Sequence, residues 1–299
     1  MQNKQMNKAV FIETVVKNLH GDIRVMWWSG GITSAVAGKF AIEMYDNVEF
    51  FYCETGAAHP DNIRFKADCE NWYSKKINHV KNSSGYNSPA DVWLKTGYIN
   101  GVDGARCSLE LKKKVRFELE ELMRPNLFYP NRGIIQNQIY GFEWEQRQVN
   151  RAIRFLEQYP YANAIFPLIE QMKTKNNCAG ILTSAGIELP HLYKLGYNNN
   201  NCLSDECVCC KGGMGYMNKT RIDFPLGFKN TSLIERNIGY SCMNGKFLDE
   251  LNPNEGRGLK PIVPECGEFC DVELIESPHP NVEKVMRGEM TVYEAKQAA

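Results

Sequence analysis

Glycine and hydroxyl side chains stand together near residue 30 in a pattern that can bind phosphate. Residues 29–34 read Ser-Gly-Gly-Ile-Thr-Ser. Because Gly30 and Gly31 have no Cβ, backbone amides can close on phosphate oxygens, and a helix that follows would point its positive end at the same anion. A glycine turn without a ligand is the alternative, since short glycine motifs are common, and no Gly-Lys-Ser/Thr sequence completes a Walker loop. The hydroxyl donors of the motif are Ser29, Thr33 and Ser34.

Cysteine pairs in the last hundred residues form a second pattern with chemical meaning. Seven of the eleven cysteines follow residue 200. In a reducing compartment, closely spaced cysteines more often bind metal than form disulfides. Two pairs, Cys207 with Cys210 and Cys266 with Cys270, have spacings typical of a structural zinc site with four thiolates. Ordinary reduced cysteines are the alternative, and two nearby thiols can substitute as ligands, Cys202 and Cys209.

Alternating strand and helix patterns must position the glycine motif. The apolar run 23–28 predicts a buried strand that stops at the glycines, and the alanine-rich segment 33–45 predicts the next helix. A second strand at 48–53, a helix at 61–76 and a third strand at 76–80 follow. This alternation implies right-handed crossovers and a parallel sheet, whose ligands lie beyond the carboxyl ends of the strands.

The other patterns predict a chain with two parts. Further elements predicted from apolar spacing are helices at 8–20, 143–157 and 175–185 and a strand at 133–142. Gly186 is suited to end the last of these helices in a left-handed conformation. Beyond residue 197 regular periodicity is scarcer and asparagine, glycine, cysteine and proline dominate. We therefore expect a nucleotide-binding α/β domain at 1–197 and a smaller cysteine-rich, metal-binding region at 198–299.

Charge and hydropathy argue against several classes of protein. Lysine plus arginine and aspartate plus glutamate number 35 each, so no whole-chain field attracts nucleic acid or an anionic membrane. No apolar run is as long as a membrane span, and the first residues lack the apolar stretch of a secretory signal. The 5 tryptophans lie in helical or strand patterns, which favours the core over a stacking platform for single strands. We expect a cytoplasmic protein that binds neither membrane nor nucleic acid directly.

Further motifs accompany the glycine motif in order along the chain. They are Glu54-Thr55-Gly56-x-x-His59-Pro60-Asp61-Asn62, Gly104-Ala105-Arg106-Cys107-Ser108-x-x-Leu111-Lys112, Phe166-Pro167-Leu168-Ile169-Glu170, Ala185-Gly186-Ile187-Glu188-Leu189-Pro190, Lys211-Gly212-Gly213-Met214-Gly215-Tyr216 and Glu265-Cys266-Gly267. Together with Ser-Gly-Gly-x-x-Ser, they resemble the PP-loop family of ATP pyrophosphatases and adenine nucleotide α-hydrolases. Within it the likeness is to the PAPS reductase-like branch, as carried by phages and bacteria. Motifs spread in order over residues 23–270 indicate a family more specifically than one loop does.

The resemblance implies a Rossmann-like parallel sheet flanked by helices, with ATP or PAPS at the glycine motif. It implies that phosphate is bound by Ser29, Gly30, Gly31, Thr33 and Ser34, and that the adenosine is approached by Glu54, Thr55 and Gly56. His59 is expected either to donate to the ligand or to cap the following helix. Arg106 and Lys112 are the expected catalytic cations, because arginine makes bidentate contacts with phosphate and lysine adds a point charge.

The reaction implied by the resemblance is attack of a substrate oxygen on the α-phosphate of ATP. Pyrophosphate leaves, an unknown acceptor is adenylylated, and Mg²⁺ is the expected helper. The expected partners are thus a small-molecule nucleotide and an acceptor. A homodimer is an open alternative, because no segment indicates an oligomeric state.

Two other functions stay open. The first is a thiol-dependent sulfonucleotide reductase, in which Cys266 would attack sulfur and a thioredoxin-type partner would resolve the adduct. Against it, the Glu-Cys-Gly motif does not end the chain here as it does in those reductases. An iron–sulfur cluster is less favoured than zinc, because Cys107-Ser108 stands where those enzymes carry a Cys-Cys pair. The second is a non-catalytic nucleotide-binding accessory protein.

Overall fold

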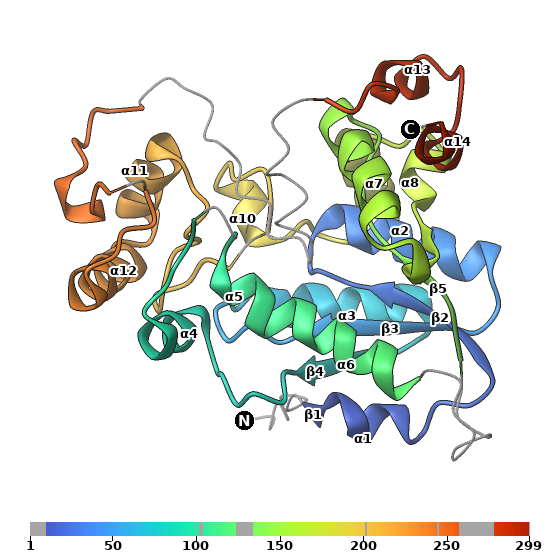
Figure 1. The fold of residues 1–299 in the computed structure, drawn as a ribbon, viewed down its shortest axis with the longest axis horizontal. Helices are drawn as coiled ribbons and strands as arrows, with labels where there is room; N and C mark the ends of the chain where they lie inside the picture. Colours follow the sequence, from blue (N-terminus) through green and yellow to red (C-terminus); the bar gives the residue numbers. More distant parts are fainter. Residues whose placement is uncertain are drawn as a thin grey trace.

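A six-stranded parallel sheet lies at the centre of the molecule (Figure 1). The computed structural model describes residues 10–101, 104–123, 134–200, 202–243, 245–256 and 278–298. The strands are β1 (Val10–Phe11), β2 (Asp22–Trp27), β3 (Val48–Cys53), β4 (Ile77–Lys81), β5 (Ile134–Ile139) and β6 (Ala164–Ile165). Their order is β1-β4-β3-β2-β5-β6, and every neighbouring pair is parallel. The predicted α/β class with a parallel sheet is confirmed.

Helices cover the sheet and extend beyond it (Figure 1). In the first half of the chain they are α1 (Ile12–Val16), α2 (Ile32–Met44), α3 (Asn62–Tyr73), α4 (Pro89–Thr96), α5 (Arg106–Ser108), the π-helical turn η1 (Leu109–Lys113) and α6 (Lys114–Leu122). In the second half they are α7 (Gln146–Gln158), η2 (Pro160–Ala162), α8 (Pro167–Glu170), α9 (Lys175–Ser184), α10 (His191–Lys194), α11 (Met214–Asp223), α12 (Pro225–Ile238), η3 (Leu248–Glu250), α13 (Val282–Met286) and α14 (Val292–Gln297). None of the helices in the described part of the chain is long and apolar enough to cross a membrane.

The direction of chain progression changes beside β2. From β2 the chain passes through α2 to β3 and through α3 to β4, moving toward one edge of the sheet. It later returns to place β5 on the opposite side of β2, with β6 beyond it. The switch point of the sheet therefore lies between the paired strands β2 and β5, and open α/β sheets bind their ligands beyond the carboxyl ends of the strands at this point.

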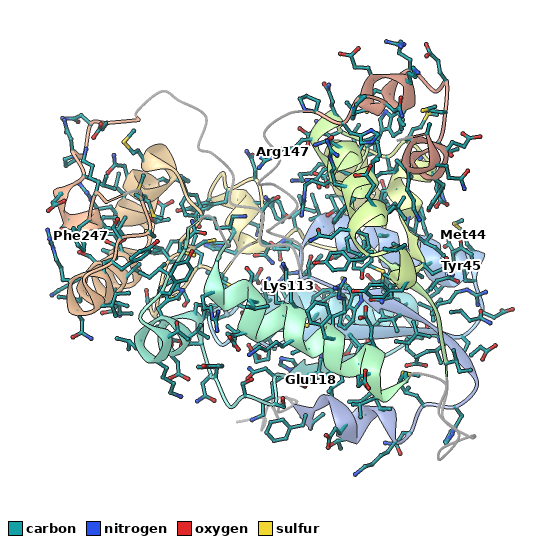
Figure 2. The ribbon with its side chains drawn as sticks, viewed as in Figure 1. Met44, Tyr45, Lys113, Glu118, Arg147 and Phe247 are labelled. Atoms are coloured by element: carbon teal, nitrogen blue, oxygen red, sulfur yellow. The ribbon has the colours of Figure 1, made fainter. Side chains whose placement is uncertain are left out.

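The central strands are apolar because helices bury both of their faces. Val25 and Met26 of β2 and Phe50 and Phe51 of β3 are completely buried. Strands that are buried on both faces show a continuous apolar run, whereas strands with one exposed face alternate apolar and polar residues. Side chains fill the space between the sheet and the helices, including the run from η1 to α6 that carries Lys113 and Glu118 (Figure 2). The sheet is thus a rigid base for the loops at its edges.

The predicted strand at 48–53 has the predicted bounds, and most other elements differ by a few residues at their ends. One prediction was wrong in kind. The segment 8–20, predicted as one helix, begins its described part with the edge strand β1 and continues with the short helix α1. Val10 and Phe11 pair with Val80 and Lys81 of β4, so a contact distant in sequence overrides the local helical spacing.

The region beyond residue 197 has more regular structure than we predicted. It contains the helices α11 and α12, which share a buried core with α4 and with the cysteines of this region. Further along the chain, α13 and α14 pack against α7, and their Val282, Val285 and Val292 join the core of the sheet. Figure 1 shows α13 and α14 beside α7 and, on the other side of the view, α4 with α11 and α12.

Candidate functional site

The glycine loop, residues 29–34, lies at the carboxyl end of β2 and leads directly into α2. Gly30 has a φ of +85°, which a residue with a side chain rarely adopts, and this lets the chain reverse within the loop. Gly31 is the N-cap of α2 and has no side chain to cap the helix. Amides of a first helical turn have no partner within the helix and are suited to bind an anion, although the Ile32 N–H also faces the Tyr193 hydroxyl at 3.4 Å.

Hydroxyl groups hold the glycine loop in a closed shape. The backbone N–H of Ser29 donates to the Ser34 Oγ at 3.1 Å, and the Ser29 Oγ lies 3.0 Å from the same oxygen. The Ser34 hydroxyl in turn donates to the Gly31 carbonyl oxygen at 2.9 Å. Ser34 is nearly buried, so its role in the loop is first to fix the backbone. The hydroxyl of Thr33 is the one that the loop itself does not use.

The segment 190–200, which we call the strap, contacts the glycine loop through Tyr193 and Asn200. The Asn200 Nδ2 donates to the Gly30 carbonyl oxygen at 2.7 Å and to the Asn62 Oδ1 at 2.6 Å. The backbone N–H of Ile32 faces the Tyr193 hydroxyl oxygen at 3.4 Å. Burial raises the pKa of Tyr193, so its hydroxyl stays neutral at physiological pH. These contacts hold the loop in position from outside the sheet's own strands.

A cavity opens at the switch point, in front of the glycine loop. It encloses about 1110 Å³ of empty space, open solvent at its mouth included. Its lining comes from the ends of β2, β3 and β5, from α2, from η1, from the start of α7 and from the strap. The residues that line it are Trp27, Trp28, Ser29, Gly31, Thr33, Ser34, Phe51, Tyr52, Cys53, Thr55, Ala58, Asn62, Lys112, Tyr140, Gly141, Phe142, Glu143, Gln148, Arg151, Tyr193, Asn199, Asn200 and Cys202.

The structure brings part of the predicted site together in this cavity. The predicted residues that line it are Ser29, Gly31, Thr33, Ser34, Thr55 and Lys112. Lys112 lies on the π-helical turn η1, a type of irregularity that often marks functional positions. Thr55 is nearly buried after β3 and its Oγ1 accepts a hydrogen bond from the Cys202 thiol at 3.2 Å. The predicted residues in the lining therefore come from three separate chain segments, which meet at one cavity.

Glu54 and Gly56 have structural partners and are not part of the cavity lining. The Glu54 Oε2 lies 2.6 Å from the His79 Nε2, and its Oε1 accepts the Gly56 backbone N–H at 2.6 Å. Burial alone would raise the pKa of the Glu54 carboxyl, but these two hydrogen bonds hold the pKa below its usual value. An ionised Glu54 thus fixes the turn after β3 and with it the position of Thr55.

His59 and Arg106 also lie outside the cavity lining. The His59 Nδ1 accepts the Asp61 backbone N–H at 3.1 Å, next to the start of α3, and its ring stacks on His191 with centroids 5.1 Å apart. The contact lies at the N-cap residue of α3, and a role of His59 in ligand binding stays a prediction. Arg106 pairs through its Nη2 with the Glu110 Oε1 at 3.0 Å, and the Glu110 side chain is almost fully buried. This ion pair orients Arg106 along its own helix.

The cysteine-rich region does not yet define a metal site. Cys207 and Cys210 are buried, whereas Cys266 and Cys270, their predicted co-ligands, lie outside the described residues. Within the described residues no group of three or more histidine, cysteine or acidic side chains is arranged to hold a metal ion. A hydrogen bond with Cys107, burial and the nearby thiols of Cys209 and Cys242 raise the pKa of Cys210 well above its usual value. The structural zinc therefore stays a prediction.

Several lining residues were missed in the sequence. They are Glu143, Gln148, Arg151, Tyr193, Asn199, Asn200, Cys53 and Cys202, none of which was predicted to bind the nucleotide. One signal could have found two of them: Gln148 and Arg151 stand three residues apart on the otherwise apolar face of α7. Polar side chains on a buried helix face need partners, and a ligand is one kind of partner.

No protein-family model matches the chain, and no curated protein matches it. The assignments at this site therefore rest on its own residues and geometry.

Proposed function

We propose that this chain is an enzyme that binds an adenine nucleotide in the switch-point cavity and acts at its α-phosphate. The observation that carries the proposal is the position of the glycine loop. It follows β2, lines the cavity and lies at the carboxyl end of β2, at the switch point between β2 and β5. Ligands of open parallel sheets bind at this point, and uncapped amides at a helix start favour the phosphates of a ligand.

The cavity lining offers groups that suit both the phosphates and the base of a nucleotide. The glycine loop and Lys112 offer amides, hydroxyls and a positive charge for the phosphates. Trp28 and Tyr52 line the same cavity with aromatic surface, which is suited to a flat, weakly polar base. Polar and aromatic groups in one cavity match a nucleotide better than they match a free phosphate ion.

In the proposed reaction, an oxygen of the acceptor forms a bond to the α-phosphorus of ATP. The bond from that phosphorus to the oxygen bridging to the β-phosphate breaks, and pyrophosphate leaves with the electron pair. The acceptor's proton passes to solvent, and water can replace the acceptor, which yields AMP. Lys112 and the amides of the glycine loop neutralise charge that builds up on the departing pyrophosphate, which is the main task in phosphoryl transfer. Mg²⁺ is proposed as the counterion that accompanies ATP.

Product identification after incubation with ATP tests this proposal. We expect pyrophosphate and AMP, or an adenylylated acceptor when cell-extract metabolites are added. Lys112→Gln should slow pyrophosphate release by about ten- to a hundredfold, because a charge-assisted contact is lost. Lys114→Gln is the matched control, since Lys114 pairs with Glu110 and does not line the cavity. ADP and phosphate as products, or sulfite release from PAPS, would contradict the proposal.

A further inference from the structure

The side chain of Asn200, in the strap, bonds the peptide unit that joins the two glycines of the loop. Its Nδ2 donates to the Gly30 carbonyl oxygen at 2.7 Å and to the Asn62 Oδ1 at 2.6 Å, and Asn62 is nearly buried at the start of α3. Both protons of this amide group therefore have an acceptor, which fixes the orientation of the side chain. One amide thus connects the strap, the glycine loop and α3.

The hydrogen bond from Asn200 also sets the direction of the next backbone amide. In a planar trans peptide, the carbonyl oxygen and the following N–H point in opposite directions. Because the Gly30 carbonyl oxygen faces Asn200, the Gly31 N–H points away from the Asn200 amide. Gly31 lines the cavity, and no acceptor for its N–H is found among the described residues. This N–H is therefore a donor that stays available to a ligand in the cavity.

Glycine on both sides makes this peptide unit easy to turn over. Gly30 has a φ of +85°, and neither glycine has a Cβ that would oppose other backbone angles. The hydrogen bonds inside the loop join Ser29, Ser34 and the Gly31 carbonyl oxygen, and none of them holds the Gly30 carbonyl oxygen. A group outside the loop must therefore select the orientation of this peptide. If the peptide turned over, a carbonyl oxygen would replace the N–H and would repel a phosphate.

We propose that Asn200 is a positioning residue for phosphate: it holds the peptide between Gly30 and Gly31 in the orientation in which the Gly31 N–H can donate to a phosphate oxygen. The inference rests on the proposed function, because it names an amide that the phosphates of the nucleotide would use. Asn200 acts through the backbone, so its effect is confined to the phosphate part of the ligand. The affinity for the nucleoside part does not depend on it.

Asn200→Asp tests the proposal, because it keeps the shape of the side chain and removes the donor. A carboxylate accepts hydrogen bonds and repels the Gly30 carbonyl oxygen, so the peptide should turn over. ATP, adenosine and inorganic tripolyphosphate are titrated separately at constant ionic strength, with the fluorescence of Trp27 and Trp28 in the cavity lining as the signal. We expect the variant to bind ATP and tripolyphosphate about ten- to a hundredfold more weakly and adenosine with unchanged affinity.

Two other substitutions separate the lost donor from the added charge. Asn62→Asp places a carboxylate beside the same loop, but its oxygen still accepts the Asn200 amide, so ATP binding should weaken less than in Asn200→Asp. Asn198→Asp makes the same change at an exposed residue of the strap outside the cavity lining, and it should bind all three probes like the wild-type protein.

Two results overturn the proposal. One is an ATP affinity of Asn200→Asp equal to that of Asn62→Asp, which would assign the whole effect to charge. The other is an equal loss of ATP and adenosine binding in Asn200→Asp, which is the result of a merely structural role. Should Asn200→Asp not fold, Asn200→Ala provides the same comparison of ATP with adenosine, because it removes the donor without adding a charge.

The tripolyphosphate titration separates this inference from the proposed function. A wild-type protein that binds tripolyphosphate but neither ATP nor adenosine would refute the proposed function alone. The tripolyphosphate affinities of Asn200→Asp and Asn62→Asp would then still decide the inference. A wild-type protein that binds ATP no more tightly than adenosine, and does not bind tripolyphosphate, would overturn the inference. Binding of none of the probes would refute both.

Discussion

Gly141 connects the glycine loop to the rest of the sheet, and its replacement by alanine tests whether that contact positions the loop. Gly141 follows β5, and a Cβ at this position would lie 2.6 Å from the Ser34 Cα and 2.7 Å from the Ser34 N. Both are backbone atoms in the first turn of α2, so the clash cannot be relieved by a change of side-chain rotamer. To reach ordinary van der Waals separation, the start of α2 must move away by roughly 1 Å.

The size of this displacement sets the expected effect. Overpacking a tight contact costs about 1–3 kcal/mol, so Gly141→Ala should lower the free energy of unfolding by about that amount. A displacement of about 1 Å in a positioning element costs roughly a hundredfold in rate. We therefore expect Gly141→Ala to fold, to release pyrophosphate about a hundredfold more slowly and to bind ATP more weakly. Denaturant unfolding, calorimetry and the pyrophosphate assay measure the three quantities.

Gly180→Ala is the control for this experiment. Gly180 lies inside α9, and a Cβ there would meet no atom within 4 Å. Alanine at an open helix position should stabilise the protein by about 0.5–1 kcal/mol and leave ATP binding unchanged. If Gly141→Ala has the stability and ATP affinity of the wild-type protein, the close packing of β5 against α2 does not position the loop, and the reasoning fails.

Two further predictions concern a buried carboxylate and an acid-sensitive histidine. Glu235 is fully buried and accepts hydrogen bonds from the backbone N–H groups of Cys242 and Leu248, each at 2.7 Å. Glu235→Gln should therefore lower the free energy of unfolding, measured in urea, by about 2 kcal/mol. An equal loss in Glu283→Gln, at an exposed carboxylate, would contradict this reason. Burial and the nearby His191 lower the pKa of His59, so below pH ~6.5 the unfolded chain binds a proton that the folded protein does not. The free energy of unfolding should therefore decrease as the pH falls from ~6.5 toward the lowered pKa. The urea midpoint of the wild-type protein should change more over this pH range than the midpoint of His59→Asn. Equal changes in the two proteins would refute the assignment.

The sheet could be predicted because its signal is local. Each central strand is a short apolar run that ends at a turn, and each intervening helix has its own spacing. The edge strand β1 could not be predicted, because Val10 and Phe11 are extended only through their pairing with β4. Their neighbours have helical spacing, and nothing within this segment indicates the pairing.

Helices α11 and α12 were not predicted, because glycine and proline, which are typical of turns, lie at helix starts and at a close helix contact in this region. Gly213 is the N-cap of α11, and Pro225 occupies the first turn of α12, where a missing N–H costs nothing. Gly227 lies within α12 because a Cβ there would be 2.1 Å from the Ser204 carbonyl oxygen. Composition alone cannot distinguish a glycine in a loop from a glycine at a close helix contact.

The candidate site could be predicted only where its residues are close in sequence. The glycine loop is one short motif, and Thr55 and Lys112 belong to motifs of the family that the chain resembles. Arg151 and Asn200 come from distant segments, and only the fold brings them to the cavity. The orientation of Glu54 toward His79 is likewise a result of the pairing of β3 with β4.

Hydrogen–deuterium exchange with and without ATP tests the central claim most directly. If the amides of the glycine loop bind the phosphates, saturating ATP should slow exchange in peptides that cover residues 29–36. AMP should protect this segment less, because it lacks the pyrophosphate group. Strong ATP binding with unchanged exchange in this segment, or protection confined to other parts of the chain, would contradict the claim that the loop after β2 holds the nucleotide.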